Sequence, residues 1–125
     1  MINKQRPKHL DLKSIKLPLP GIVSILHRIS GLLMFLALPL LLLMLQCSLR
    51  SIETYTQLIS ALAHPLAKLA LLGLFWAFMH HFCAGLRFLA IDLHRVRNLA
   101  RARASSKVVL AASLLLTVLA GVKLW

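Results

Sequence analysis

Two adjacent histidines, His80 and His81, lie in the middle of a long apolar stretch of the sequence. An ionisable side chain at the centre of a membrane helix costs about 2.5–3.5 kcal/mol on insertion scales, so such residues are candidates for a function. Neutral imidazole is a common axial ligand of haem iron, and it also forms hydrogen bonds between membrane helices. One interpretation therefore makes one of these histidines a cofactor ligand, and the other makes both structural.

Helix geometry distinguishes the two histidines. Consecutive helical residues point about 100° apart, so only one of them can face a given cofactor. The face of His81 also carries Ala84, Gly85, Phe88 and Asp92. The face of His80 is bulkier and carries Trp76, Cys83 and Arg87. Because small residues beside a ligand let a flat porphyrin approach the helix, we predict that His81 is the ligand, while Arg87 is a candidate to hold a propionate or a phosphate.

A second polar group lies in the preceding apolar segment, within "SILHRISG". On a helix, Ser24, His27, Arg28 and Gly31 fall inside an arc of about 100°. This face can bind a carbonyl ligand or haem propionates, although Arg28 can equally extend to the headgroups. We expect His27 and His81 to differ in height by about 5–10 Å, so that His27 suits the haem edge and a second axial histidine comes from another polypeptide.

The composition of the chain is that of a membrane protein. Of its 125 residues, 59% are hydrophobic and 14% are charged, and Lys plus Arg number 15 against 3 Asp plus Glu. The basic residues cluster outside the apolar segments, which argues against a nucleic-acid-binding face. Two cysteines, without CxxC spacing, predict no disulfide framework.

Three segments are long enough to cross a bilayer as helices. We predict an all-α membrane protein whose three transmembrane helices form part of a multi-subunit helical bundle, with polar inward groups satisfied by a partner. The expected segments are an N-terminal arm at 1–21, spans at 22–46, 66–92 and 108–125, an external loop at 47–65 and a basic loop at 93–107. Ser105 and Ser106 are expected to cap the third span.

The distribution of Lys and Arg predicts the orientation. Six lie in the N-terminal part through Arg28 and six between Arg87 and Lys107, whereas the first loop has only Arg50, with Lys68 just after it. The N-terminus and the 93–107 loop are therefore expected in the cytoplasm and the C-terminus in the periplasm.

Three motifs resemble those of the cytochrome b556 membrane-anchor subunits of succinate dehydrogenase. They are "RP" at Arg6–Pro7, S-x-x-H-R-x-S from Ser24 to Ser30, and H-x-x-x-G-L-R-F-L-x-x-D from His81 to Asp92. The similarity extends over the whole chain, with the same order of motifs and spans.

The resemblance implies a subunit that is not catalytic alone and that, with a second small membrane subunit, anchors an iron-sulfur protein and a flavoprotein. It implies that His81 ligates haem b, whose other ligand comes from the partner anchor, and that Ser24 and Arg28 line a ubiquinone pocket. His27 and Arg28 would lie near the haem propionates. The lack of a mitochondrial presequence favours a bacterial inner membrane.

The sequence departs from the family pattern at a few positions. Lys8 replaces an aliphatic residue, Ile91 an aromatic residue or methionine, and His94 a small residue. None is a proposed ligand, and Asp92 is given no role. Two alternative functions remain open: the anchor of a fumarate reductase that uses menaquinone, and a structural membrane subunit without a cofactor.

Overall fold

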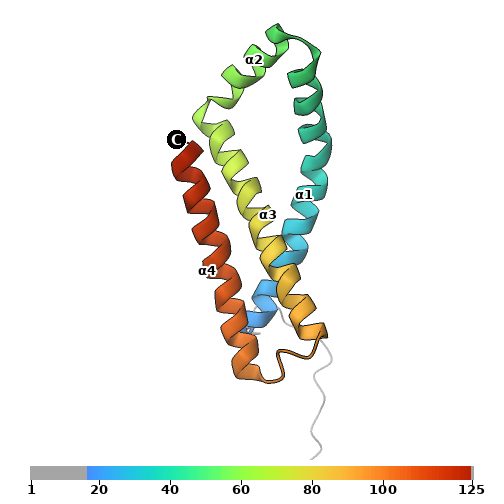
Figure 1. Ribbon diagram of the computed structural model, residues 1–125, viewed down its shortest axis with the longest axis vertical. Coiled ribbons are helices and arrows are strands. Elements are labelled where there is room, and N and C mark those ends of the chain that lie inside the picture. Colours follow the sequence, from blue (N-terminus) through green and yellow to red (C-terminus); the bar gives the residue numbers. More distant parts are fainter. Residues whose placement is uncertain (1–16, 125) are drawn as a thin grey trace, which may run out of the picture.

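Four helices form the part of the chain that the computed structural model describes, residues 17–124. They are α1 (Leu19–Arg50), α2 (Ile52–Leu62), α3 (Pro65–Asp92) and α4 (Leu99–Leu124). The helices α1, α3 and α4 are long and apolar enough to cross a membrane, which confirms the predicted all-α fold with three apolar spans. They lie side by side in an up-down-up arrangement, and α2 connects α1 to α3 at one end of the bundle (Figure 1).

The helix α1 extends beyond the expected span at both ends, and a further helix, α2, forms within the expected external loop. Pro18 precedes α1, which continues through Pro39, as expected for a membrane helix. The expected external loop is mostly helical: the Ser51 hydroxyl accepts from the Thr54 backbone N–H at 3.1 Å, and the Thr54 hydroxyl accepts from the Ser51 N–H at 3.2 Å. This reciprocal capping box starts α2.

The turn between α3 and α4 also forms by local capping. The backbone N–H of His94 donates to the Ile91 carbonyl at 2.9 Å, and that of Arg95 donates to the Ala90 carbonyl at 3.0 Å. This is a Schellman motif, and it places His94 at a φ of 56°. Glycine adopts such a backbone conformation more readily than histidine does.

The fourth helix begins earlier than the apolar run indicates. The Asn98 side chain accepts a hydrogen bond from the Arg101 N–H at 2.9 Å, so α4 starts at Leu99. Ser105 and Ser106 therefore lie inside α4, and the prediction that they cap it is wrong. Arginines within 99–107 do not prevent helix formation, because arginine has a high helix propensity.

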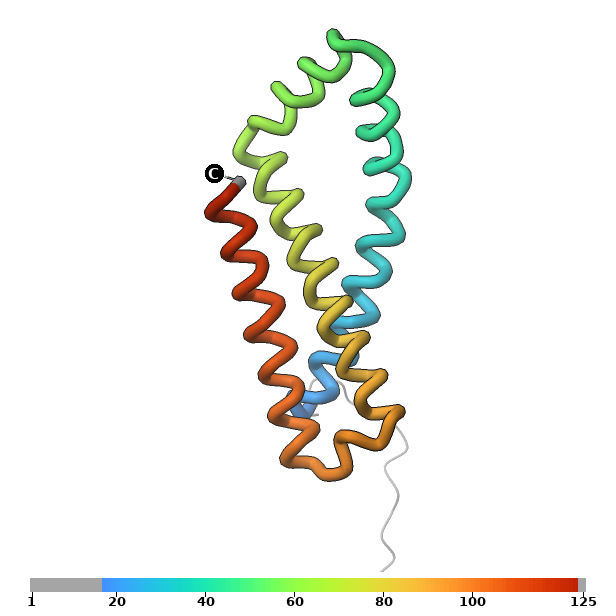
Figure 2. Tube along the Cα trace, viewed as in Figure 1, coloured from blue at the N-terminus to red at the C-terminus, as the bar shows by residue number. Residues whose placement is uncertain are grey.

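The middle helix of the bundle is α3, which packs against both α1 and α4 (Figure 2). Its core contacts join Val23 of α1, Ala84 of α3 and Val109 of α4, all almost fully buried. Most large apolar side chains instead face outward, such as Phe35, which is 70% exposed. Outward leucines and phenylalanines are suited to lipid or to neighbouring membrane subunits.

The helices α1 and α3 cross near one end of the bundle and diverge toward α2, as Figure 2 shows. A mainly apolar space of about 640 Å³ lies between them, lined by residues such as Leu33, Met44 and Leu74. His27 and His81 meet at this crossing point.

Candidate functional site

The crossing of α1 and α3 is built on Gly31 and His81. A β-carbon added to Gly31 would lie 2.8 Å from Cε1 and 3.2 Å from Nδ1 of the His81 ring. Only a residue without a side chain leaves room for the imidazole at this distance. Gly31, which the sequence placed on the polar face of the first span, therefore forms the cradle of the His81 ring.

Hydrogen bonds at the crossing determine which nitrogen of His81 carries the proton. Nδ1 lies 3.0 Å from the carbonyl oxygen of His27 and 3.3 Å from the Ser30 hydroxyl. Because a carbonyl oxygen can only accept, Nδ1 is the protonated nitrogen. Ser30 itself donates to the same carbonyl at 2.9 Å, which leaves its oxygen free to accept.

The opposite nitrogen of His81, Nε2, is left with its lone pair. It forms no hydrogen bond with any residue in the described range 17–124. A histidine whose Nδ1–H is held by a carbonyl, with Nε2 free, has the arrangement typical of a metal-ligating imidazole. The sequence analysis did not assign Ser30 or the His27 carbonyl to the site, because their contacts with His81 depend on how the two helices cross.

The rings of His27 and His81 are stacked, with centroids 4.0 Å apart and planes inclined by 12°. The expected height difference of 5–10 Å is therefore wrong, because the straight-helix estimate ignored how α1 crosses α3. Two axial ligands must point at one iron from opposite sides, whereas these rings lie face to face. His27 is still unsuited to be the second ligand, now because of its orientation. The ring of Phe88 packs edge-on against His27, with centroids 5.1 Å apart.

Ser24 and Arg28 lie one helical turn apart on α1, near the end of the helix that precedes the crossing. Ser24 is half-buried and Arg28 is exposed. The structure places them beside the His27–His81 pair along the chain, but no hydrogen bond within residues 17–124 joins their side chains to it. They form an open polar edge on which a ligand carbonyl or carboxylate can bind.

His80 occupies a different environment from His81. Its side chain is fully buried, and it lies beside Trp76, with ring centroids 5.4 Å apart. The Val23 backbone faces the ring, but neither imidazole nitrogen forms a hydrogen bond of acceptable geometry, and Trp76 Nε1 also lacks a partner among the described residues. An enclosed ring cannot present a nitrogen to a group as large as a porphyrin without repacking of the residues around it.

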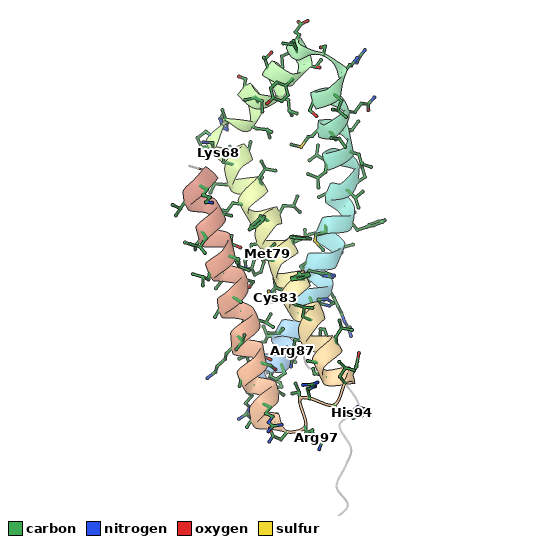
Figure 3. All side chains as sticks on the ribbon, viewed as in Figure 1. Lys68, Met79, Cys83, Arg87, His94 and Arg97 are labelled. Carbon is green, nitrogen blue, oxygen red and sulfur yellow. The ribbon has the colours of Figure 1, made fainter. Side chains whose placement is uncertain are left out.

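Arg87 points away from this crossing, toward α4 (Figure 3). Cys83, also labelled in Figure 3, lines the same groove between α3 and α4 as Arg87 does. Its Nε donates to the Ser105 hydroxyl at 3.0 Å, and its terminal nitrogen donates to the Ala102 carbonyl at 3.4 Å. Arg87 and His81 thus lie on opposite flanks of α3.

No group of three or more His, Cys, Asp or Glu side chains suited to a metal ion occurs in the described range. A porphyrin supplies four nitrogen ligands to its own iron, so a single imidazole from each of two chains completes the coordination. The cradle at Gly31 and the free Nε2 of His81 fit such a group.

Comparison with known proteins agrees with the motifs and their placement. Residues 2–120 match the family described as the succinate dehydrogenase/fumarate reductase transmembrane subunit. The chain belongs to this family. It is also similar to the succinate dehydrogenase cytochrome b556 subunit of Coxiella burnetii, with 38% identity over 125 residues that cover 99% of this chain and all of that protein.

Membership in this family fits the architecture. The chain is a cytochrome b-type membrane subunit of the succinate dehydrogenase and fumarate reductase class, with three apolar helices that serve as membrane spans. The resemblance seen in the sequence is thereby confirmed, whereas the roles of His81, His27, Ser24 and Arg28 stay predictions.

Proposed function

We propose that this chain is the membrane-anchor cytochrome b subunit of a succinate:quinone oxidoreductase. In this proposal it shares one haem b with a second small anchor subunit and forms part of the ubiquinone site. The free Nε2 of His81 is the observation that carries the proposal, because Nδ1 is held by the His27 carbonyl and Gly31 leaves room for the ring. The name of the Coxiella relative, a cytochrome b556 subunit, supports the choice of haem b.

In this proposal His81 is the axial ligand from this chain. The Nδ1–H bond to a backbone carbonyl keeps the ring in one tautomer and raises the basicity of Nε2. Bound haem b supplies a one-electron redox centre between the iron-sulfur protein and the quinone. His27 and Arg28, which lie at the same end of α1, are assigned to the haem propionates, where the guanidinium can form charge-assisted hydrogen bonds.

The quinone site is assigned to Ser24 and Arg28. Their one-turn spacing lets a hydroxyl and a guanidinium approach one carbonyl group. The hydroxyl donates a hydrogen bond to the quinone oxygen, and the positive charge favours negative charge that develops on that oxygen during reduction. The exposure of Arg28 fits a ligand that enters from outside this chain.

The remaining subunits follow from the family. We assign an iron-sulfur subunit and a flavoprotein subunit to the basic side of the bundle, which bears the 93–98 turn and the start of α1. The Lys and Arg distribution puts this side in the cytoplasm of a bacterium, so that α4 ends in the periplasm. Succinate oxidation belongs to the flavoprotein, and the second axial histidine belongs to the partner anchor.

Purification of the complex in mild detergent tests the proposal. We expect three other subunits to co-elute and the reduced-minus-oxidised spectrum to show a b-type band. His81→Ala should remove this band, whereas His94→Asn, at an exposed histidine in the α3–α4 turn, should leave it unchanged. Recovery of this chain alone, without the band, would instead support a structural subunit that holds no cofactor.

Ser24→Ala and Arg28→Lys test the quinone site separately. Loss of a polarising donor in such a site typically costs about 100-fold or more in turnover, and a partly exposed donor less. We expect both variants to lower the turnover of ubiquinone reduction while the haem band is retained. Unchanged turnover in both variants would contradict the assignment of this edge.

The family description also includes fumarate reductase, so the anchor of a menaquinone-dependent fumarate reductase is the second candidate. The two functions use the same side chains in opposite directions. The ratio of succinate oxidation to fumarate reduction, measured with ubiquinone and with menaquinone analogues, separates them.

A further inference from the structure

A groove of about 390 Å³ lies between α3 and α4, on the flank of α3 opposite His81. Its walls are mainly apolar, and its two polar lining side chains are Arg87 and Ser105. The volume is in the range of small-ligand sites. The apolar walls run along Cys83, Val108 and Ala112.

The side chain of Arg87, which lines this groove, is buried and lacks a counter-charge. Arg87 is only 7% exposed, and its two acceptors, the Ser105 hydroxyl and the Ala102 carbonyl, are both uncharged. No carboxylate in the described range pairs with it. Because arginine has five N–H donors, at least three remain for another ligand. A desolvated cation without an anion is unfavourable, so the site calls for a negatively charged group.

The depth of Arg87 in the membrane matches that of a lipid phosphate. The 28 residues of α3 span about 42 Å, which is close to the full thickness of a bilayer with its headgroups. Arg87 lies five residues, or about 7.5 Å, before the end of the helix at Asp92. It therefore lies near the boundary between headgroups and hydrocarbon. The groove extends past Arg87 in both directions, to Cys83 and Ala112 toward the membrane centre and to Ala90 and Val96 toward the α3–α4 turn.

A haem propionate does not explain this site. Arg87 follows His81 by six residues, which places the two side chains about 120° apart around α3. The contacts agree, because His81 packs against α1 and Arg87 against α4. A porphyrin ligated by His81 lies on the other flank.

We propose that an anionic phospholipid binds here, with its phosphate on Arg87 and Ser105 and one acyl chain in the groove beside Val108 and Ala112. The ligand combines the two features that the groove offers, a negative headgroup and an apolar tail. The chain has 15 basic residues and only 3 acidic ones, which also favours binding of anionic lipids. The site is independent of the haem and quinone roles and requires only that the bundle lies in a membrane.

Native mass spectrometry of the intact complex, titrated with phosphatidylglycerol or phosphatidylcholine, tests the site. We expect tighter binding of phosphatidylglycerol in the wild-type complex. Arg87→Gln should weaken this binding by about fivefold or more and remove the preference. Arg101→Gln is the matched control, because it removes the same charge from an exposed position on α4 and should retain the preference.

Ala112→Phe provides a second test that keeps Arg87. The larger ring should fill the groove and weaken binding of both lipids. This variant therefore tests the lipid site even if the Arg87→Gln complex fails to assemble. Equal phosphatidylglycerol affinities for Arg87→Gln and Arg101→Gln would overturn the proposal. The proposal would also be overturned if inorganic phosphate abolished the preference, since the ligand would then be a free anion. It would be overturned as well if Ala112→Phe left lipid binding at the wild-type level, as expected if a partner helix fills the groove.

Discussion

Adding one methyl group at Gly31 should loosen the crossing of α1 and α3. The new β-carbon would lie 2.8 Å from Cε1 of His81, whereas ordinary contacts begin at 3.4 Å. The ring, or the whole of α1, must therefore move by about 0.6 Å. A shift of this size would lengthen the bond from His81 Nδ1 to the His27 carbonyl, now 3.0 Å, beyond good hydrogen-bond geometry.

The energetic cost follows from these distances. Overpacking costs about 1–3 kcal/mol, and the lost hydrogen bond costs about 0.5–1.5 kcal/mol. Replacing a helical glycine by alanine returns about 1 kcal/mol of helix propensity. We therefore expect Gly31→Ala to destabilise the protein by about 2 kcal/mol and to lower the amount of bound haem.

Gly73→Ala is the matched control for this experiment. It changes the same residue type on a membrane helix, but nothing lies within 4 Å of the added β-carbon. The assay is thermal unfolding of the purified complex in detergent, with the haem-to-protein ratio measured in parallel. Gly73→Ala should be neutral or slightly stabilising. If Gly31→Ala behaved like Gly73→Ala in both measurements, the packing of His81 on Gly31 would be refuted.

Three further predictions concern single contacts. Ser30→Ala removes the hydroxyl 3.3 Å from His81 Nδ1. It should speed haem loss to excess apomyoglobin by about tenfold, the lower end of the effects of groups that hydrogen-bond a metal ligand. An unchanged rate would mean that the His27 carbonyl alone is enough to hold the His81 ring. His94→Gly relieves the positive φ of 56° and should stabilise the complex by about 1 kcal/mol, seen as a higher thermal midpoint, whereas His94→Val should lower it. Asn98→Ala removes the cap of α4 and should cost about 1 kcal/mol in the same assay, with the exposed neighbour Arg97→Ala as a control expected to stay near wild type.

Much of the fold could be predicted because uncharged apolar runs long enough for a bilayer are rare outside membrane helices. The three spans were found this way. The helix α2 and the early start of α4 were not, because they depend on local caps at Ser51 and Asn98 rather than on hydropathy. Polar sequence with good helix formers was therefore interpreted as loop.

For the candidate site, positions around a single helix could be predicted from the sequence, whereas contacts between helices could not. Helical angles favoured His81 over His80 as the ligand, which stays a prediction, and the full burial of His80 could not be found from the sequence. The bond from His81 to the His27 carbonyl could not be found, because the two residues are 54 positions apart in sequence and their contact depends on the tilt between α1 and α3. Each helix taken alone gave the wrong relative height.

The position of α3 between its two neighbours separates two kinds of chemistry within one helix. Its imidazole faces α1 and its guanidinium faces α4, about 9 Å apart along the axis. Changes this far apart with no shared partner usually combine without interaction. A double variant such as Ser30→Ala with Arg87→Gln should thus show the separate deficits of each parent, one in haem retention and one in lipid selectivity. If both proposals hold, α3 keeps the two sites energetically independent of each other.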